Sequence, residues 1–171
     1  MTVTRVVKTG LVIVGLGQEI RGDDGAGIAA VRSWQAKYTE TASHPLIRVE
    51  LVETPGLALT DILAGAQVAL IVDAVQSGQP AGEVSLVEES QLETYSSGTG
   101  TAHGFGVAET LSLARSLEPA KLPNRLILLG IEAGDLGLGH GLSAPVEAAL
   151  PAAARFIQEL ICRFFLPDST A

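Results

Sequence analysis

Three polar side chains that lie far apart in the sequence are predicted to meet at one edge of a β-sheet. Asp24 follows the apolar run 11–14 after a glycine-rich turn, Asp73 ends the run 69–73, and His103 immediately precedes a segment of helical period. In an open parallel sheet, ligands bind outside the carboxyl ends of the strands. Two carboxylates and one imidazole would leave open positions on a bound cation. Such nitrogen and oxygen donors suit zinc, nickel or iron(II) without distinguishing among them.

Each of these residues also has a purely structural interpretation. Asp23 or Asp24 can cap the helix that follows, because an aspartate accepts backbone N–H groups and suits the positive end of the helix dipole. Asp73 can accept a hydrogen bond from a neighbouring loop, and His103 can be a solvated residue at a helix start. A cap explains one aspartate of the adjacent pair and leaves the second without a role.

The opening stretch and the charge of the chain exclude several other kinds of site. A dinucleotide-binding G-x-G-x-x-G turn needs a third glycine where the sequence has Ile20, and two carboxylates would repel a pyrophosphate. No G-K-[ST] follows the turn, and the H-E-x-x-H and G-x-S-x-G signatures are absent. The net charge of −8 argues against nucleic acid and against an anionic membrane surface as partners.

Short apolar runs alternate along the chain with segments of helical period. We expect strands at 10–15, 47–53, 68–74, 82–88 and 125–131, and helices at about 24–37, 57–63, 105–117 and from Ser143 onward. Pro145 suits the first turn of the last helix, and Pro151 is expected to kink or split it. The alternation predicts an α/β fold with a mostly parallel central sheet and helices on both faces, and the pattern at 82–88 predicts an antiparallel edge strand.

The size and composition of the chain predict one globular domain over residues 1–171. The chain has 171 residues, 47% of them hydrophobic, which is enough for a substantial core. Its single cysteine, Cys162, lies in an apolar run and is expected to be a buried thiol. We expect a cytoplasmic protein, because "MTVTRVVKTG" lacks the apolar part of a signal peptide and no stretch approaches about 20 apolar residues.

Four blocks of sequence, in order, resemble the hydrogenase maturation proteases, the endopeptidases that trim the C-terminus of the large subunit of nickel–iron hydrogenases. The blocks are "GLGQEIRGDDGAG" (15–27), "LIVDAVQSGQPAGEV" (70–84), "TAHGFGVAETLSLAR" (101–115) and "LILLGIEAGDLGLGHGLSAPVEAAL" (126–150). They are similar to the family's G-x-G-N and G-D-[DE]-G-x-G segments, its strand ending in D-A, its S-S-H helix start and its G-L-S-P-x-V helix.

The resemblance implies a three-layer α/β sandwich and a site. The family's metal-contacting residues fall on Asp24, Asp73 and His103, which would also be the catalytic residues of an aspartyl-type endopeptidase. The family's nickel is recognised in the substrate, so the implied partner is a nickel-loaded large-subunit precursor. A bound cation can polarise a peptide carbonyl or lower the pKa of bound water, and either Asp24 or Asp73 can instead act as the general base. Alternatives are an accessory protein that docks on the large subunit without cutting it and a peptidase of this fold with a different precursor.

The sequence departs from the family pattern at three places. Gln18 replaces the turn asparagine, "ETPG" (53–56) replaces D-G-G-T, and "TAH" (101–103) replaces S-S-H. The second change is expected to alter which large subunit is accepted. Near the presumed edge, Arg21 and Glu132 are expected to be solvated or structural, and His140 can reach the substrate.

Overall fold

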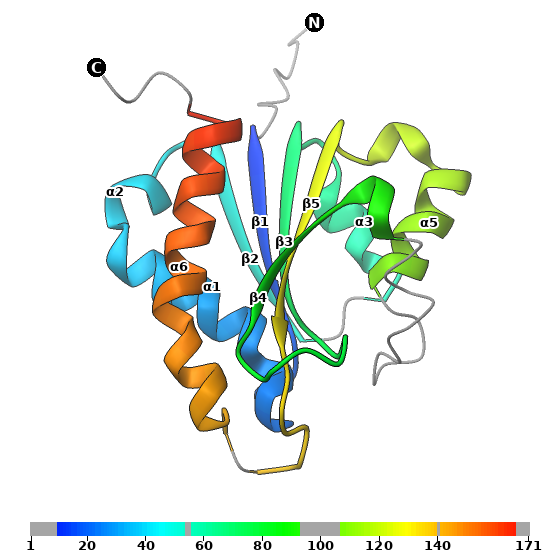
Figure 1. Ribbon diagram of the computed structural model, residues 1–171. Coiled ribbons are helices and arrows are strands. Elements are labelled where there is room, and N and C mark those ends of the chain that lie inside the picture. The colour runs from blue at the N-terminus through cyan, green and yellow to red at the C-terminus, as the bar shows by residue number, and fades with distance from the viewer. Residues whose placement is uncertain (1–9, 54–55, 93–106, 140, 167–171) are drawn as a thin grey trace, which may run out of the picture.

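A five-stranded sheet with the order β2-β1-β3-β5-β4 forms the centre of the molecule (Figure 1). The computed structural model describes residues 10–53, 56–92, 107–139 and 141–166. The strands are β1 (Leu11–Leu16), β2 (Ile47–Val52), β3 (Val68–Val75), β4 (Val84–Glu88) and β5 (Arg125–Glu132). All neighbours pair in parallel except β4, which runs antiparallel to β5 at one edge. The predicted sheet, including its antiparallel edge strand, is confirmed.

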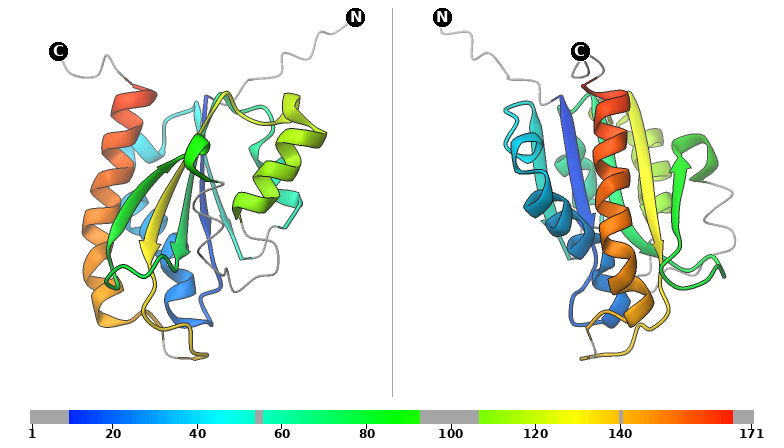
Figure 2. Two further views of the ribbon diagram at one scale, coloured as in Figure 1. Left: turned by 45° about the vertical axis from the view of Figure 1, so that its right-hand side comes forward. Right: turned by 60° about the vertical axis from the view of Figure 1, so that its left-hand side comes forward.

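Helices cover both faces of the sheet and complete the three-layer sandwich that the resemblance implied. One face carries α1 (Ala26–Lys37), α2 (Thr39–Ala42) and α6 (Ala144–Phe164), and the other carries α3 (Ala58–Leu63) and α5 (Val107–Leu117) (Figures 1 and 2). Short 3₁₀ helices lie at η1 (Gly22–Gly25), η2 (Glu89–Gln91) and η3 (Pro119–Lys121). Among the helices of the described residues, none combines the length and apolar character needed to cross a bilayer.

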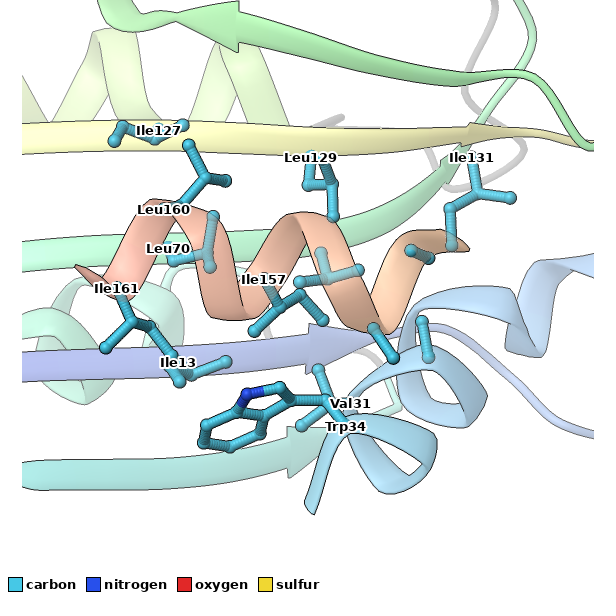
Figure 3. Close-up of a cluster of buried hydrophobic side chains, with 14 of the residues drawn as sticks. Ile13, Val31, Trp34, Leu70, Ile127, Leu129, Ile131, Ile157, Leu160 and Ile161 are labelled. Atoms are coloured by element: carbon cyan, nitrogen blue, oxygen red, sulfur yellow. The ribbon is translucent and has the colours of Figure 1, made fainter. Parts of the chain in front are cut away.

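The central strands are buried on both sides because their side chains alternate between two cores. One set faces α1 and α6 and the other faces α3 and α5. Figure 3 shows Trp34 of α1 and Ile157 and Ile161 of α6 together in the first core. The indole Nε1–H of Trp34 donates a hydrogen bond of 3.0 Å to Oε1 of Gln158, which satisfies its buried N–H and connects α1 to α6.

Two glycines allow α1 to begin directly against the ends of the strands. Gly17 has a φ of +133°, and a Cβ at this position would overlap the carbonyl oxygen of Asp24. A Cβ on Gly27 would overlap the carbonyl oxygens of Val72 and Leu16. The first turn of α1 therefore touches the ends of β1 and β3, which brings the aspartate pair to the carboxyl edge of the sheet. The glycines of this stretch allow close packing of the backbone and do not form a binding loop for a nucleotide phosphate.

The last helix differs from the sequence prediction in two respects. It has Ser143 at its N-cap position and a proline in its first turn, as predicted. It runs from Ala144 to Phe164 as one helix, so the predicted split at Pro151 is wrong, while a kink there stays a prediction. Pro151 is exposed, so its missing N–H lies on the solvent side while the opposite face stays packed on the sheet. Cys162 is also exposed, so the predicted buried thiol is wrong. Ile161 takes the buried position, and the next residue points about 100° around the helix from it.

Replacing Gly27 by alanine should destabilise the protein, although the same change in an exposed helix position normally stabilises by about 1 kcal/mol. The added methyl has no space beside the two carbonyl oxygens, so we expect a loss of about 2 kcal/mol, typical of overpacking. Urea unfolding followed by circular dichroism measures the change. Ala36→Gly, on the exposed side of α1, is the control and should cost about 1 kcal/mol. A more stable Gly27→Ala variant would contradict the close approach.

Candidate functional site

The connections that follow β1, β3 and β5 meet at the carboxyl edge of the sheet (Figure 1). We call these connections, residues 17–25, 76–83 and 133–143, the rim. The backbone N–H of Asp23 donates to the carbonyl of Asp135 at 2.8 Å, and that of Gly139 donates to the carbonyl of Ile20 at 2.8 Å. The first and third connections are thus held together by main-chain hydrogen bonds.

Asp23 joins these two connections with its side chain as well. Its carboxylate is fully buried and accepts the backbone N–H groups of Gly134 and Asp135 at 2.8 Å and of Ser143 at 2.6 Å. The Ser143 hydroxyl donates a fourth hydrogen bond at 2.8 Å. Burial alone would raise the pKa of Asp23, but these hydrogen bonds outweigh it and hold that pKa below its ordinary value. Asp23 is therefore an ionised structural group.

The prediction that Asp23 or Asp24 caps the following helix is wrong. Gly25 occupies the N-cap position of α1, which has no side-chain capping hydrogen bond, and η1 has none either. The donors to Asp23 come from a connection more than 100 residues away in the sequence, which no local pattern reveals. Ser143 likewise directs its hydroxyl to Asp23 and makes no side-chain cap for α6.

Asp24 lies just beyond Asp23 and has a different environment. It is 7% exposed, and its Oδ2 accepts the backbone N–H of Gln18 at 2.8 Å. Because the donor is the main chain of Gln18, the replacement of the family's asparagine at this position leaves this hydrogen bond in place. The glycine turn and η1 together hold the Asp24 carboxylate at the rim, on the side facing β3.

Asp73 shares this part of the rim with Asp24. It lies two residues before the end of β3, which continues to Val75, and is partly buried. Burial, together with repulsion from the Asp24 carboxylate, raises the pKa of Asp73 to about 7, while a hydrogen bond of 2.9 Å from the Ala74 N–H acts in the opposite direction. Two carboxylates are thus brought together at one place, and a cation bound beside them would favour the ionised form of both.

His103, the third member of the predicted set, lies outside the described residues, as does His140. Among the residues that the structure does describe, no group of three or more His, Cys, Asp or Glu is arranged to hold a metal ion. The structure thus brings together two of the three predicted site residues, and the three-ligand site stays a prediction.

Glu132 holds the connection that follows Asp73. This last residue of β5 is 4% exposed, and its carboxylate accepts hydrogen bonds from the N–H and hydroxyl of Ser77 and from the N–H of Gly78, at 2.7 to 3.0 Å. We expected Glu132 to be either solvated or structural, and the structure shows that it is structural. The sequence signal was an acidic residue at the end of the apolar run 126–131, but nothing there indicated which loop it holds.

Comparisons with known proteins agree on one family. The sequence model of the hydrogenase maturation protease family matches residues 29–160. The hydrogenase expression/formation protein HupD of Thiocapsa roseopersicina is 26% identical over 158 residues, which are 90% of this chain and 68% of that protein. The [NiFe] hydrogenase maturation protease HybD from Thermococcus kodakarensis is 28% identical with a TM-score of 0.70, covering 88% of this chain and 98% of that chain. The hydrogenase maturating endopeptidase HybD from E. coli shares the fold at 22% identity, with a TM-score of 0.74 over 90% of this chain and 93% of that one.

Neutralising the two adjacent aspartates should have unequal consequences for stability. Asp23→Asn weakens four buried hydrogen bonds and should lower the free energy of unfolding by about 2 kcal/mol at pH 7. That difference should shrink below about pH 4, because the contribution of a carboxylate with a lowered pKa is lost as pH falls. Asp24→Asn removes a repelling charge and should change stability by less than about 1 kcal/mol. Urea titrations at pH 7 and pH 3.5 test both variants, and equal losses would contradict the assignment.

The Asp73 carboxyl should titrate near pH 7 in metal-free protein. Carbon-13 NMR of labelled aspartates in the presence of EDTA measures this, and Asp24→Asn should lower the value. The folded pKa lies above the unfolded one, so stability should fall as pH rises between about 4 and 7, by at most about 1.4 kcal/mol per pH unit. An Asp73→Asn variant should lack this component. A wild-type Asp73 that titrates near pH 4 would show that the two carboxylates do not share a site.

Proposed function

We propose that this chain, which belongs to the hydrogenase maturation protease family, removes the C-terminal extension from the large-subunit precursor of a nickel–iron hydrogenase after that precursor has received nickel. Membership of this family makes the chain a peptidase. The observation that carries the proposed substrate is the pair Asp24 and Asp73 at the carboxyl edge of the sheet, where burial and repulsion from Asp24 raise the pKa of Asp73.

The donor set suits a nickel ion that arrives as part of the substrate. Asp24 and Asp73 offer carboxylate oxygens, and His103 is proposed to add an imidazole nitrogen. Burial of Asp73 and its repulsion by Asp24 disfavour joint ionisation of the two carboxylates, and a positive charge beside them favours it. A precursor that carries nickel supplies that charge, so the site would bind a loaded precursor in preference to an empty one.

The same residues can also carry the chemistry of the cut. A cation held near the scissile peptide withdraws charge from its carbonyl group and makes attack by water easier. Whichever of Asp24 and Asp73 does not face the cation directly can accept the proton of the attacking water. Asp23 takes no part in this step, because its oxygens are occupied by four hydrogen bonds, and it supports the turn that carries Asp24.

Glu53 begins the segment in which this chain departs most from the family pattern. It follows β2 and is exposed, while Thr54 and Pro55 lie outside the described residues. We propose that this segment contributes to the choice of large subunit. The alternative of a docking protein without peptidase activity drew on "ETPG" (53–56) and on the changed turn at Gln18. The second of these supports is lost because the hydrogen bond to Asp24 comes from the Gln18 backbone.

Neutralising the proposed nickel contacts should abolish processing without unfolding the protein. Asp24→Asn, Asp73→Asn and His103→Ala should each slow cleavage of the nickel-loaded precursor by about 100-fold or more. Shortening of the large subunit, followed by mass spectrometry, measures the rate, and circular dichroism checks folding. His44→Ala is the control, because His44 precedes β2 at the opposite edge of the sheet.

Two results would overturn the proposal in different ways. Equal cleavage of nickel-loaded and nickel-free precursor would remove the dependence on nickel. A stable complex in which the large subunit keeps its extension under all conditions would favour the docking protein.

A further inference from the structure

Two large apolar side chains project from the rim at positions that the backbone holds in place. Ile20 is 68% exposed and Leu138 is 69% exposed. Their turns are joined by the hydrogen bond from the Gly139 N–H to the Ile20 carbonyl, and Gly22 packs directly on the carbonyl oxygens of Asp135 and Gly137. These two side chains therefore face solvent from fixed backbone in turns that are hydrogen-bonded to each other.

Arg21 follows Ile20 and precedes the two aspartates in the same turn. Its backbone is fixed on both sides, since its N–H donates to Gln18 and its carbonyl accepts from Asp24. Among the half-buried arginines of the described residues, Arg48 and Arg115 pair with Glu50 and Glu89, whereas Arg21 has no ion pair.

The charge of the rim makes Arg21 unusual. In the sequence of residues 17–25, 76–83 and 133–143 it is the only lysine or arginine, in a chain with a net charge of −8. A guanidinium in this position is ready to bind a carboxylate with two parallel hydrogen bonds.

We propose that Ile20, Arg21 and Leu138 form a docking platform for the segment of the precursor next to the peptide bond that is cut. Ile20 and Leu138 contact an apolar side chain of that segment, and Arg21 binds a carboxylate of the same segment. This assignment rests on the proposed function. Beyond that function, it specifies which kind of precursor segment is recognised, namely one with an apolar side chain and an acidic group side by side.

The position of the platform favours the precursor over a second copy of this chain as the occupant. Arg21 is three residues from Asp24 in one turn, so a segment bound to it lies beside the proposed nickel contacts. Two copies meeting rim to rim would bring their acidic residues together, including Asp24 and Asp73 of both, and repulsion opposes that contact. A precursor that carries a nickel ion brings the opposite charge to the same place.

The test compares rim variants with matched controls in the full-length protein. The double variant Ile20→Ser/Leu138→Ser removes the apolar contact, and Leu117→Ser is its control because Leu117 is also 69% exposed but ends α5 at the other edge of the sheet. Arg21→Gln removes the cation, Arg21→Lys retains charge, and Arg155→Gln on the exposed side of α6 is the control. The probe is the nickel-loaded large-subunit precursor, with Kd from interferometry and KM and kcat from cleavage.

We expect the double variant and Arg21→Gln each to raise Kd and KM by about tenfold with little change in kcat. Arg21→Lys should recover part of the loss, and the two controls should behave as wild type. Unchanged Kd and KM in the double variant and in Arg21→Gln, with normal cleavage, would overturn the platform and leave the proposed function intact. A wild type that binds no precursor would overturn both. Self-association of the wild type that the double variant abolishes would assign these side chains to a dimer contact.

Discussion

The rim depends on one buried carboxylate. Asp23 accepts hydrogen bonds from the connection that joins β5 to α6 while its own backbone belongs to the turn that follows β1. A buried carboxylate is tolerated only when its oxygens are satisfied, and here four donors satisfy them. The interaction therefore fixes the relative position of two distant connections. Everything carried on those connections, including Asp24, Arg21 and Leu138, is positioned by it.

Adjacent identical residues have opposite electrostatic environments in this protein. Asp23 is stabilised in its charged form by converging N–H and O–H groups, whereas Asp24 faces a second carboxylate at Asp73. The two environments differ because Asp23 and Asp24 are consecutive residues of the tight turn η1 and point their side chains to different sides. One side meets the backbone of the β5–α6 connection and the other meets the end of β3. The structural group and the proposed functional group of this pair thus occupy consecutive positions in the sequence.

Most of the secondary structure could be predicted because its signal is local. The strands buried on both faces are continuous apolar runs, and the edge strand β4 alternates, which periodicity detects directly. The errors occurred where packing decided the outcome. Pro151 costs α6 one hydrogen bond, yet the buried face that includes Val146 and Ile157 keeps the helix continuous. Cys162 lies in an apolar run but on the solvent side of that helix.

The sequence by itself determined the order of strands and helices along the chain and the identity of the acidic residues near the strand ends, because each of these depends on neighbours along the chain. Only the tertiary structure decided which aspartate is structural, which loop Glu132 holds, and how strongly Asp24 acts on Asp73. These properties depend on donors and charges supplied by segments more than 40 residues away. The protonation state and burial of a group depend on the atoms that surround it, and most of those atoms come close only when the chain is folded.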